Sequence, residues 1–429
     1  MKRSDFDRRA FLLSLASTGA LAACSRSGGS GSVVPTTGDA DGNSSHATSP
    51  TDLVLVNNTS YPDGEVFFYV WGQANGQIQY LLPNGDIKQW TPAIGNDFGI
   101  PLSKTPKVKL PKFVAAEIYV SLGTGQPSFL NGQGANQHEP VAPNAWNSNA
   151  YGKNYDKLFD HIEYTYIDKT LGVNTTTVDM LSLPFTYTLT AGGTAHTYGF
   201  DPKKRMSALF AEFEATPIFK NLLVKGGKNK YLRVIAPGHG IENTQQKLEN
   251  QFPVNYLQPY INQCWDYYKK NVLSIYTDDE KTLLATGQVD INDVFLFKNT
   301  KGQPVTWKGW TGFAKPTSLG AFECAANEIP SPSDSSQPVD SMTNIFGACG
   351  KNLGATLNRT VLLNSKKQPW CQTAHFYKNP QTNIYSKILH EYALDGKFYG
   401  FAYDDLCGYS NYAAVDNATQ LKLAIGTLD

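Results

Sequence analysis

The sequence predicts a mainly β protein into which a smaller mixed α/β region is inserted. Three observations support this fold class. From Asp52 to about Leu189, short β-branched and aromatic runs alternate with Gly, Pro, Asn and Asp clusters, as in a sandwich or barrel. Apolar residues then take helical spacing, and strand-like runs return near the C-terminus. The predicted units are a β domain at 52–197, a mixed region at 198–340 and a return to the β domain at 341–429.

The individual elements follow from the spacing of apolar residues. Period-two patterns predict the strands of the first part, which are DLVLVNN, EVFFYVW, QIQYLL, KFVAAEIYVSL, HIEYTYI, VNTTTVDML and LPFTYTLT. Helical spacing predicts helices in the segments that start at Pro202, Asn255 and Ser341, with strand-like YLRVIA and DVFLFK among them. The final runs KFYGFAYDD and QLKLAIG are predicted to be β again.

Residues 1–24 have the pattern of an export and lipidation signal. Arg8 and Arg9 form a twin-arginine pair, and the apolar run after them is shorter than the about 20 residues needed to span a bilayer. The run ends in LAAC, which resembles a bacterial lipobox with Cys24 as the lipid-bearing residue. We therefore expect an exported protein, held at the bacterial cell envelope by a lipid anchor, with the outer membrane preferred, or else secreted. An ordinary signal with a chance cysteine is the alternative.

Residues 25–51 are rich in Ser, Gly, Thr and Asp. Such a segment cannot bury enough apolar surface to offset its ordering entropy, so we expect a disordered tether.

The composition limits the partners. Lys plus Arg and Asp plus Glu both number 37, so net charge gives no reason to expect nucleic acid. Charged residues make up 17% of the chain and aromatic residues 12%, together with many Thr and Asn. Neutral, hydroxyl-bearing ligands suit such a surface. A monomer is expected.

Six cysteines are present, and five of them follow the predicted signal. An exported chain permits disulfides, and an odd number leaves one thiol unpaired. Cys264 lies apart in a helical pattern and is the expected free thiol. The remaining four allow three pairings, of which we favour Cys324–Cys349 with Cys371–Cys407. The cysteine spacings do not resemble a zinc motif and the seven histidines are scattered, so neither a metal site nor a cofactor is expected.

One pair of carboxylates has a spacing that suits catalysis. Alternation in HIEYTYI places Glu163 and Thr165 on one face. A hairpin symmetric about Thr170 would put Glu163 opposite Thr177 and make Asp179 its diagonal neighbour, roughly 7–8 Å away. Carboxyls about 6.5–9.5 Å apart are typical of inverting glycosidases, whereas a register shifted by two residues gives the roughly 5 Å of retaining enzymes. Solvated carboxylates on the sheet surface are the alternative.

The segment from Glu163 to Asp179 resembles the core motif of glycoside hydrolase family 64, the laminaripentaose-releasing endo-β-1,3-glucanases. The resemblance extends to NLGATLNRTVLL and to ILHEYALDGKFYGFAYDD, and covers most of residues 52–429. The latter segment and VLVNNTSYPDGEVFFYVWG also look like the closing and opening motifs of thaumatin-like proteins. The resemblance implies a thaumatin-like β domain joined to a smaller α/β domain, with a wide groove between them for a β-1,3-glucan strand.

The resemblance also implies roles for residues. Glu163 matches the catalytic acid, whose pKa should be raised, and Asp179 matches the base that activates a water, with inversion of the anomeric centre. Three positions match substrate-binding ones, namely Thr165, Asn174 and Thr176. The acidic pair Asp404 and Asp405 is expected to line the groove, or alternatively to hold a loop by hydrogen bonds.

Two positions depart from the family pattern. The family usually has Trp where this chain has Gly172, and often has Asn where it has Ile167. These changes put the substrate length and the product size in doubt.

The leading hypothesis is therefore an enzyme that cleaves β-1,3-glucan internally. The departures at Gly172 and Ile167 favour an alternative, a β-glucan-binding lipoprotein without activity. A thaumatin-like envelope or host-interaction protein is the third possibility. The segments APGHGIEN around His239 and ILHEY around His390 show no nucleophile signature.

Overall fold

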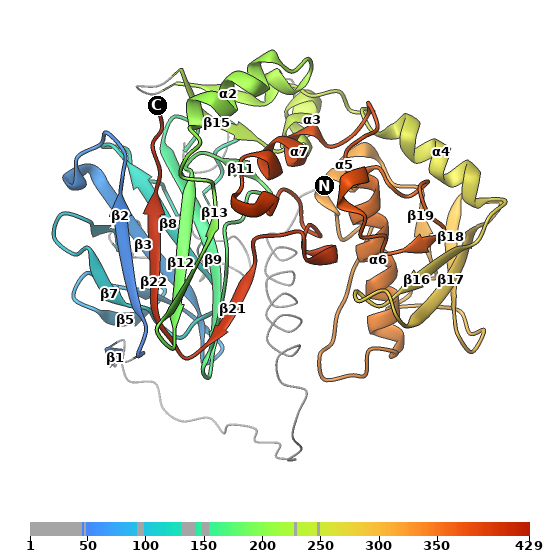
Figure 1. Ribbon diagram of the computed structural model, residues 1–429, viewed down its shortest axis with the longest axis horizontal. Coiled ribbons are helices and arrows are strands. Elements are labelled where there is room, and N and C mark those ends of the chain that lie inside the picture. The colour runs from blue at the N-terminus through green and yellow to red at the C-terminus, as the bar shows by residue number, and fades with distance from the viewer. Residues whose placement is uncertain are drawn as a thin grey trace.

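A computed structural model describes residues 45–46, 49–91, 98–129, 140, 143–147, 154–226, 230–246 and 249–429. Cys24, the predicted signal at 1–24 and most of the predicted tether lie outside these residues. The chain forms a β lobe and a mixed α/β lobe, and C-terminal segments run between the two (Figure 1).

The β lobe contains two sheets. The larger has nine strands in the order β1-β5-β4-β3-β8-β9-β10-β21, with β6 paired to β3. Its strands are β1 (Ser45–His46), β3 (Val66–Ala74), β4 (Gln77–Leu81), β5 (Asp86–Gln89), β6 (Ile100–Pro101), β8 (Val114–Leu122), β9 (Leu158–Ile167), β10 (Thr170–Asn174) and β21 (Ala413–Asp416). The second sheet has five strands in the order β13-β12-β22-β2-β7. Its strands are β2 (Asp52–Asn57), β7 (Lys107–Lys109), β12 (Phe185–Ala191), β13 (Thr194–Gly199) and β22 (Ala418–Ile425).

The interior of the β lobe lies between these sheets. Tyr164 and Tyr166 of β9 are buried, and the Tyr187 hydroxyl of β12 donates to the Val173 carbonyl of β10 at 2.9 Å, which joins the sheets. The opposite face of β9 and β10 carries Glu163 and Asn174. In the described part of the chain the sheets form a sandwich and do not close into a barrel.

The folded region begins before Asp52. The Thr51 hydroxyl lies 2.9 Å from the Tyr166 hydroxyl and donates to the Ala418 carbonyl at 2.6 Å, and Thr51 is fully buried. Ser45–His46 pairs with β5. The expectation of a disordered tether reaching residue 51 is therefore wrong at its C-terminal end, because β22 offers hydrogen-bond partners that local composition does not reveal.

The mixed lobe contains two smaller sheets, ordered β11-β15-β14 and β19-β18-β17-β16-β20. Their strands are β11 (Met180–Leu181), β14 (Leu223–Lys225), β15 (Tyr231–Ile235), β16 (Leu273–Tyr276), β17 (Leu283–Val289), β18 (Val294–Asn299), β19 (Phe313–Ala314) and β20 (Lys367–Gln368). Around them lie the helices α2 (Met206–Ala215), α3 (Pro237–Gln246), α4 (Gln258–Tyr268), α5 (Ser318–Glu323), α6 (Met342–Arg359) and α7 (Ile384–Glu391).

The boundary predicted at residue 340 does not separate the lobes. Helix α6 packs against β16 and β17, and β20 pairs in parallel with β16, so both belong to the mixed lobe. The chain returns to the β lobe only with β21. Similarly, β11 lies within the predicted first β unit but pairs with β15.

Two predicted strands are wrong. VNTTTVDML is divided between β10 and β11, and residues 175–179 form an irregular segment. KFYGFAYDD is not a strand either, because the Tyr399 carbonyl accepts hydrogen bonds from the amide and the hydroxyl of Thr177 instead of joining a ladder. Among the described residues, we find no helix with the length and apolarity needed to cross a bilayer.

Candidate active site

The register of β9 and β10 decides what surrounds Glu163. Asn174 pairs with Glu163, and Gly172 pairs with Thr165. The hairpin is therefore tighter than the predicted one, and Thr177 does not lie opposite Glu163. Asp179 follows β10 in the irregular segment, so the diagonal-neighbour geometry inferred from the sequence is wrong.

Glu163 lies in a buried group of ionisable side chains. Strand β8 pairs with β9, and Glu117 of β8 is the direct cross-strand partner of Glu163. His161 lies on the same face of β9 as Glu163. The three side chains are at most 5% exposed. One carboxylate oxygen from each glutamate and one ring nitrogen of His161 lie within 4.8 Å of one another. On the other side, Asn174 Nδ2 donates to Glu163 Oε2 at 3.2 Å. A carboxyl beside a second carboxyl, shielded from water, tends to retain its proton.

His161 is fixed within this group. Its ring stacks on Tyr119 of β8 with 4.7 Å between ring centroids. Its backbone amide donates to the buried carboxylate of Asp160. The group is thus built on three adjacent strands of the largest sheet, which hold its side chains in fixed positions.

Asp179 lies in a different setting, at the start of the mixed lobe. Its backbone carbonyl accepts from the Ala236 amide at 2.8 Å, next to the first turn of α3. His239 of that helix places Nε2 3.0 Å from Asp179 Oδ1, and its Nδ1 lies 3.1 Å from Glu242 Oε2. Trp146 stacks on the imidazole with a centroid separation of 3.9 Å.

Burial by itself would lower the pKa of His239, but the hydrogen bonds and charges of Asp179 and Glu242 raise that pKa to about 9. The ring is therefore an imidazolium at neutral pH. A cation next to Asp179 favours the ionised form of its carboxyl.

The irregular segment that carries Asp179 is held by the C-terminal part of the chain. The amide and hydroxyl of Thr177 donate to the Tyr399 carbonyl at 3.0 and 2.6 Å. The Tyr385 hydroxyl of α7 donates to the Thr177 carbonyl at 2.7 Å. Residues more than 200 positions apart thus fix the approach to Asp179.

Of the three predicted substrate-binding positions, Thr165 and Asn174 lie beside Glu163, and Thr176 follows in the irregular segment. Thr165 is half-buried and its hydroxyl oxygen accepts from the Ala115 amide at 3.2 Å. Asn174 is committed to Glu163, and Thr176 is 3% exposed. Of these, Thr165 shares the face of β9 that bears Glu163.

Asp404 does not line a groove, in contrast to the expectation. It is fully buried, and its carboxylate accepts from Arg359 Nη2 at 3.0 Å, from Ser386 Oγ at 3.1 Å and from the Gly400 amide at 2.9 Å. His390 Nε2 lies 2.9 Å from its Oδ2. Despite burial, which acts in the other direction, His390 and Arg359 lower the pKa of Asp404. Its role is to hold the C-terminal segment, as the alternative reading proposed.

Asp405 is partly exposed and pairs with Lys351 of α6 at 2.8 Å. Lys351 also lies 3.1 Å from Asp278, and both carboxylates raise its pKa against the opposing effect of burial. Asp405 therefore joins α6 to the C-terminal segment.

Gly172 has an aromatic neighbour. A Cβ built on Gly172 would lie 2.5 Å from Tyr412 Oη and 3.1 Å from two atoms of that ring. Because Gly172 pairs with Thr165, the Tyr412 phenol rests on the sheet face that carries Glu163. The space left by the missing Trp side chain is thus partly filled from the segment before β21. Ile167, the second departure, is exposed at the end of β9.

Among the cysteines, Cys371 and Cys407 form the predicted disulfide. The predicted Cys324–Cys349 bond is wrong, because both thiols are free and buried, as is Cys264. Cys324 Sγ contacts Gly354 and Asn358. These positions lie about 7–14 Å along α6 from Cys349, at a rise of about 1.5 Å per residue. A disulfide requires Cα atoms less than about 7 Å apart.

Two groups of side chains bring nitrogen and carboxylate atoms within 4.8 Å of one another in the described residues. One is the Glu163 group, and the other consists of His239, Glu242 and Glu323. Such proximity is common around carboxylates without a metal ion, so the expectation of no metal site stays a prediction.

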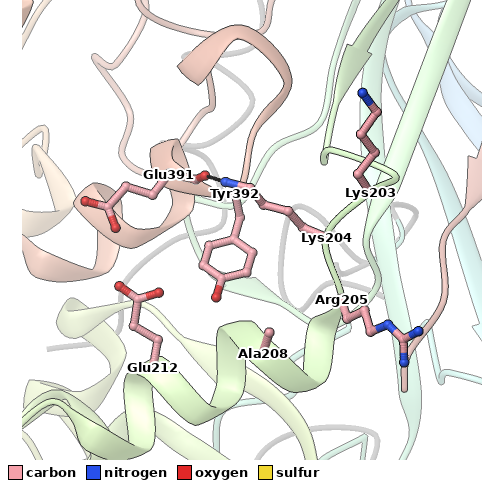
Figure 2. Close-up of a pocket in the computed structure, with 7 residues that line it drawn as sticks. All are labelled: Lys203, Lys204, Arg205, Ala208, Glu212, Glu391 and Tyr392. Carbon is pink, nitrogen blue, oxygen red and sulfur yellow. Dashed lines mark hydrogen bonds between the residues drawn. The ribbon is translucent and has the colours of Figure 1, made fainter.

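A hollow lies between α2 and the end of α7 (Figure 2). Its lining consists of Lys203, Lys204, Arg205, Ala208, Glu212, Glu391 and Tyr392. The Lys204 ammonium donates to the Glu391 carbonyl and lies over the Tyr392 ring. None of the predicted site residues lines it.

Sequence reasoning missed three residues of the site. Glu117 was assigned only to a strand, and a glutamate within the otherwise apolar AAEIYV was the available signal. His239 was set aside because one of its two spatial partners, Asp179, lies 60 residues away in the sequence. Tyr412 had no signal other than its aromatic ring.

Comparison with known proteins places this arrangement in a family. The glucan endo-1,3-beta-glucosidase of an Arthrobacter species is 24% identical over 387 residues, covering 87% of this chain and 65% of that relative. A related enzyme from Cellulosimicrobium cellulans has the same identity and coverage. The chain thus spans 65%, just under two thirds, of the length of these curated relatives.

Solved structures share the fold. A laminaripentaose-producing β-1,3-glucanase in complex with laminaritetraose superimposes with a TM-score of 0.74 and 26% identity, covering 88% of this chain and 99% of that one. The β-1,3-glucanase domain from Clostridium beijerinckii gives a TM-score of 0.71 at 22% identity, which shows the fold. The β-1,3-glucanase model of glycoside hydrolase family 64 matches residues 49–425. The chain therefore belongs to glycoside hydrolase family 64.

Proposed function

We propose that this protein is an endo-β-1,3-glucanase that uses Glu163 as general acid and Asp179 as general base. The observation that carries the assignment is the contrast between the two carboxyls. Glu163 is buried beside a second carboxyl, which favours the protonated form, whereas Asp179 contacts an imidazolium, which favours the ionised form. Carboxyls whose surroundings drive their protonation in opposite directions are suited to acid and base roles.

In this mechanism Glu163 donates its proton to the glycosidic oxygen as the bond to the anomeric carbon breaks. Asp179 accepts a proton from a water molecule that attacks the opposite face of the same carbon. The products are a shortened glucan and an oligosaccharide with an inverted reducing end. Glu163 is left ionised and Asp179 protonated, and exchange with solvent restores both.

Inversion is supported by the neighbours of Glu163. The direct cross-strand positions on both sides of it belong to Glu117 and Asn174. Asp179 lies beyond them in the irregular segment. Asp179 is therefore not a direct cross-strand partner of Glu163, the position in which two carboxyls come to the roughly 5 Å of a retaining pair.

Tyr412 supplies an aromatic surface near the acid in this proposal. Because its phenol occupies the space above Gly172, it takes over part of the sugar-stacking function of the Trp that the family usually has there. The platform comes from a different segment, so product length is expected to differ from that of laminaripentaose-releasing relatives.

A non-catalytic β-glucan-binding protein is the second candidate. The observation that favours it is the hydrogen bond that Asn174 donates to Glu163, which stabilises an ionised carboxylate and opposes an acid role.

The location is also a proposal. Cys24 would anchor the exported chain at the cell envelope, and the segment after it would let a monomeric enzyme reach a polymer too large to enter the cell. A flexible linker suits this task.

Incubation of the purified Cys24→Ser chain with laminarin or curdlan tests the function. Oligosaccharide release that is lost in Glu163→Gln and in Asp179→Asn supports the enzyme, with His196→Gln, an exposed position on β13, as control. Glucan binding without oligosaccharide release supports the second candidate. If neither binding nor release is seen, both candidate functions are rejected. Proton NMR of the first product tests inversion, because an α anomer is expected at early times and a β anomer contradicts it.

A further inference from the structure

We propose that His239 is a positioning residue whose protonated ring, clamped between Asp179 and Glu242, keeps Asp179 ionised and fixes the direction of its carboxylate. This inference rests on the proposed function of Asp179 as the base.

The geometry of the clamp is well defined. His239 Nε2 lies 3.0 Å from Asp179 Oδ1 and Nδ1 lies 3.1 Å from Glu242 Oε2, so each ring nitrogen has a carboxylate partner. The His239 side chain is 12% exposed, and the Asp179 and Glu242 side chains are 18% and 23% exposed. Partial burial makes these charge interactions stronger than those of surface pairs.

The ring must carry two protons to satisfy both partners. A neutral imidazole has one N–H and would turn a lone pair towards one of the two carboxylates. The imidazolium donates to both. The raised pKa of about 9 agrees with this state. Among the described residues, Glu323 of α5 lies near His239 and Tyr385 of α7 lies near Asp179. Glu323 adds to the negative surroundings that favour the cation.

Neighbouring groups hold the ring in place. Trp146 stacks on it with a 12° angle between the ring planes. Asn243 of α3 donates to the Trp146 carbonyl at 2.9 Å, so one helix positions both rings. The Ala236 amide, just before α3, holds the Asp179 backbone. Asp179 is therefore held at two points, through its main-chain carbonyl and through Oδ1.

Such control matters for a general base. The carboxylate must be ionised at the working pH and must be aimed at the water it deprotonates. Misplacement of a reacting group by about 1 Å can reduce the rate about 100-fold. Without the imidazolium, Asp179 would lose both its electrostatic support and its anchor.

A titration that does not depend on activity tests the charge. In the full chain labelled with ¹³C-histidine, the resonance absent from His239→Gln identifies His239. We expect it to titrate near pH 9 in the unaltered chain and at least one pH unit lower in Asp179→Asn and in Glu242→Gln. A His239 titration near pH 6.5 in the unaltered chain overturns the proposal, whatever the enzymatic activity.

Kinetics with laminarin test the effect on the base. His239→Gln retains an N–H donor but not the charge, so the acidic limb of the kcat/KM profile should move up by about one pH unit. His239→Ala loses both, so kcat should fall about 10- to 100-fold with little change in KM. Glu242→Gln should lower the pKa of His239 but leave the ring protonated at acidic pH, so the acidic limb of this variant should lie close to that of the unaltered enzyme.

His196→Gln is the matched control, and its pH profile should not change. The three clamp variants are His239→Gln, His239→Ala and Glu242→Gln. If all three lose kcat equally at every pH and also have lower unfolding midpoints, His239 has only a structural role. Unchanged profiles in the two His239 variants would also reject the proposal. If the unaltered protein shows no hydrolysis, the proposed function fails while the titration still decides the charge of His239.

Discussion

Glu163 and Asp179 are both carboxyl groups, but the molecule gives them opposite surroundings. Glu163 stands on the central strands of the largest sheet, with Glu117 and His161 around it and 5% exposure. Asp179 stands in an irregular segment between the lobes, bound to an imidazolium of α3. Figure 1 shows β9 in the β lobe and β11 with α3 in the upper part of the molecule. The difference is the basis of the proposed acid and base roles, because neighbouring charges and burial, rather than residue type, decide which form of a carboxyl is favoured.

Removal of either carboxyl should have the largest effect. Because general acid and general base catalysis each contribute about 10²–10⁴-fold, Glu163→Gln and Asp179→Asn should reduce kcat on laminarin by about 10³-fold. Azide offers a way to separate the roles, since a small anion can replace a missing base but not a missing acid. We expect partial recovery of glucan cleavage in Asp179→Asn alone, with a glycosyl azide as product, because azide attacks the anomeric carbon in place of the activated water. Recovery in Glu163→Gln would reverse the assignment.

The imidazolium beside Asp179 should make stability depend on pH. His239 has an unfolded pKa of about 6.5 and a folded pKa of about 9, so the folded state binds more protons between these values. The free energy of unfolding should therefore fall by about 2–3 kcal/mol as the pH rises from 6.5 to 9. Urea denaturation at several pH values measures this. His239→Gln should abolish this fall in the free energy of unfolding between pH 6.5 and 9. An equally steep fall in that variant would contradict the assignment of the effect to His239.

The second carboxyl beside Glu163 should move the alkaline limb of activity. Glu117→Gln removes a like charge, so Glu163 should lose its proton about one pH unit earlier and the alkaline limb of kcat/KM should shift down. The substitution leaves two other ionisable neighbours in place. These are His161, which lies next to Glu117, and Tyr399, whose pKa the Glu163 charge raises. Activity at the optimum should fall less than 10-fold. Complete loss of activity would instead indicate that Glu117 is a nucleophile in a retaining reaction.

The smallest expected effect concerns the surface beside the acid. A Cβ on Gly172 would meet Tyr412 Oη at 2.5 Å, so Gly172→Ala should displace the phenol. We expect KM for laminarin to rise about 3- to 10-fold with kcat nearly unchanged. The reason is that stacking of a sugar on an aromatic ring stabilises the bound substrate and the transition state to a similar extent. Tyr412→Ala should give the same rise, and the double variant no more than either single one. Additive effects would show that the two residues act separately.

Much of the β lobe could be predicted from local pattern. The period-two runs predicted β2, β3, β4, β8, β9 and β12, and helical spacing predicted α2, α4 and α6. These predictions succeeded because alternation and the helical period are properties of a few neighbouring residues. The same rule failed for VNTTTVDML and KFYGFAYDD, whose backbones bond to each other across more than 200 residues.

The sequence by itself determined the mainly β class, the position of Glu163 on a strand face and, through its motifs, the family, but it left three cysteine pairings open. Only the tertiary structure decided the register of β10, the burial of Asp404, the free thiols of Cys324 and Cys349, and the neighbours of the two carboxyls. Glu117 is 46 positions from Glu163 and His239 is 60 from Asp179. The protonation of a side chain depends on distances in space, which a local pattern does not contain.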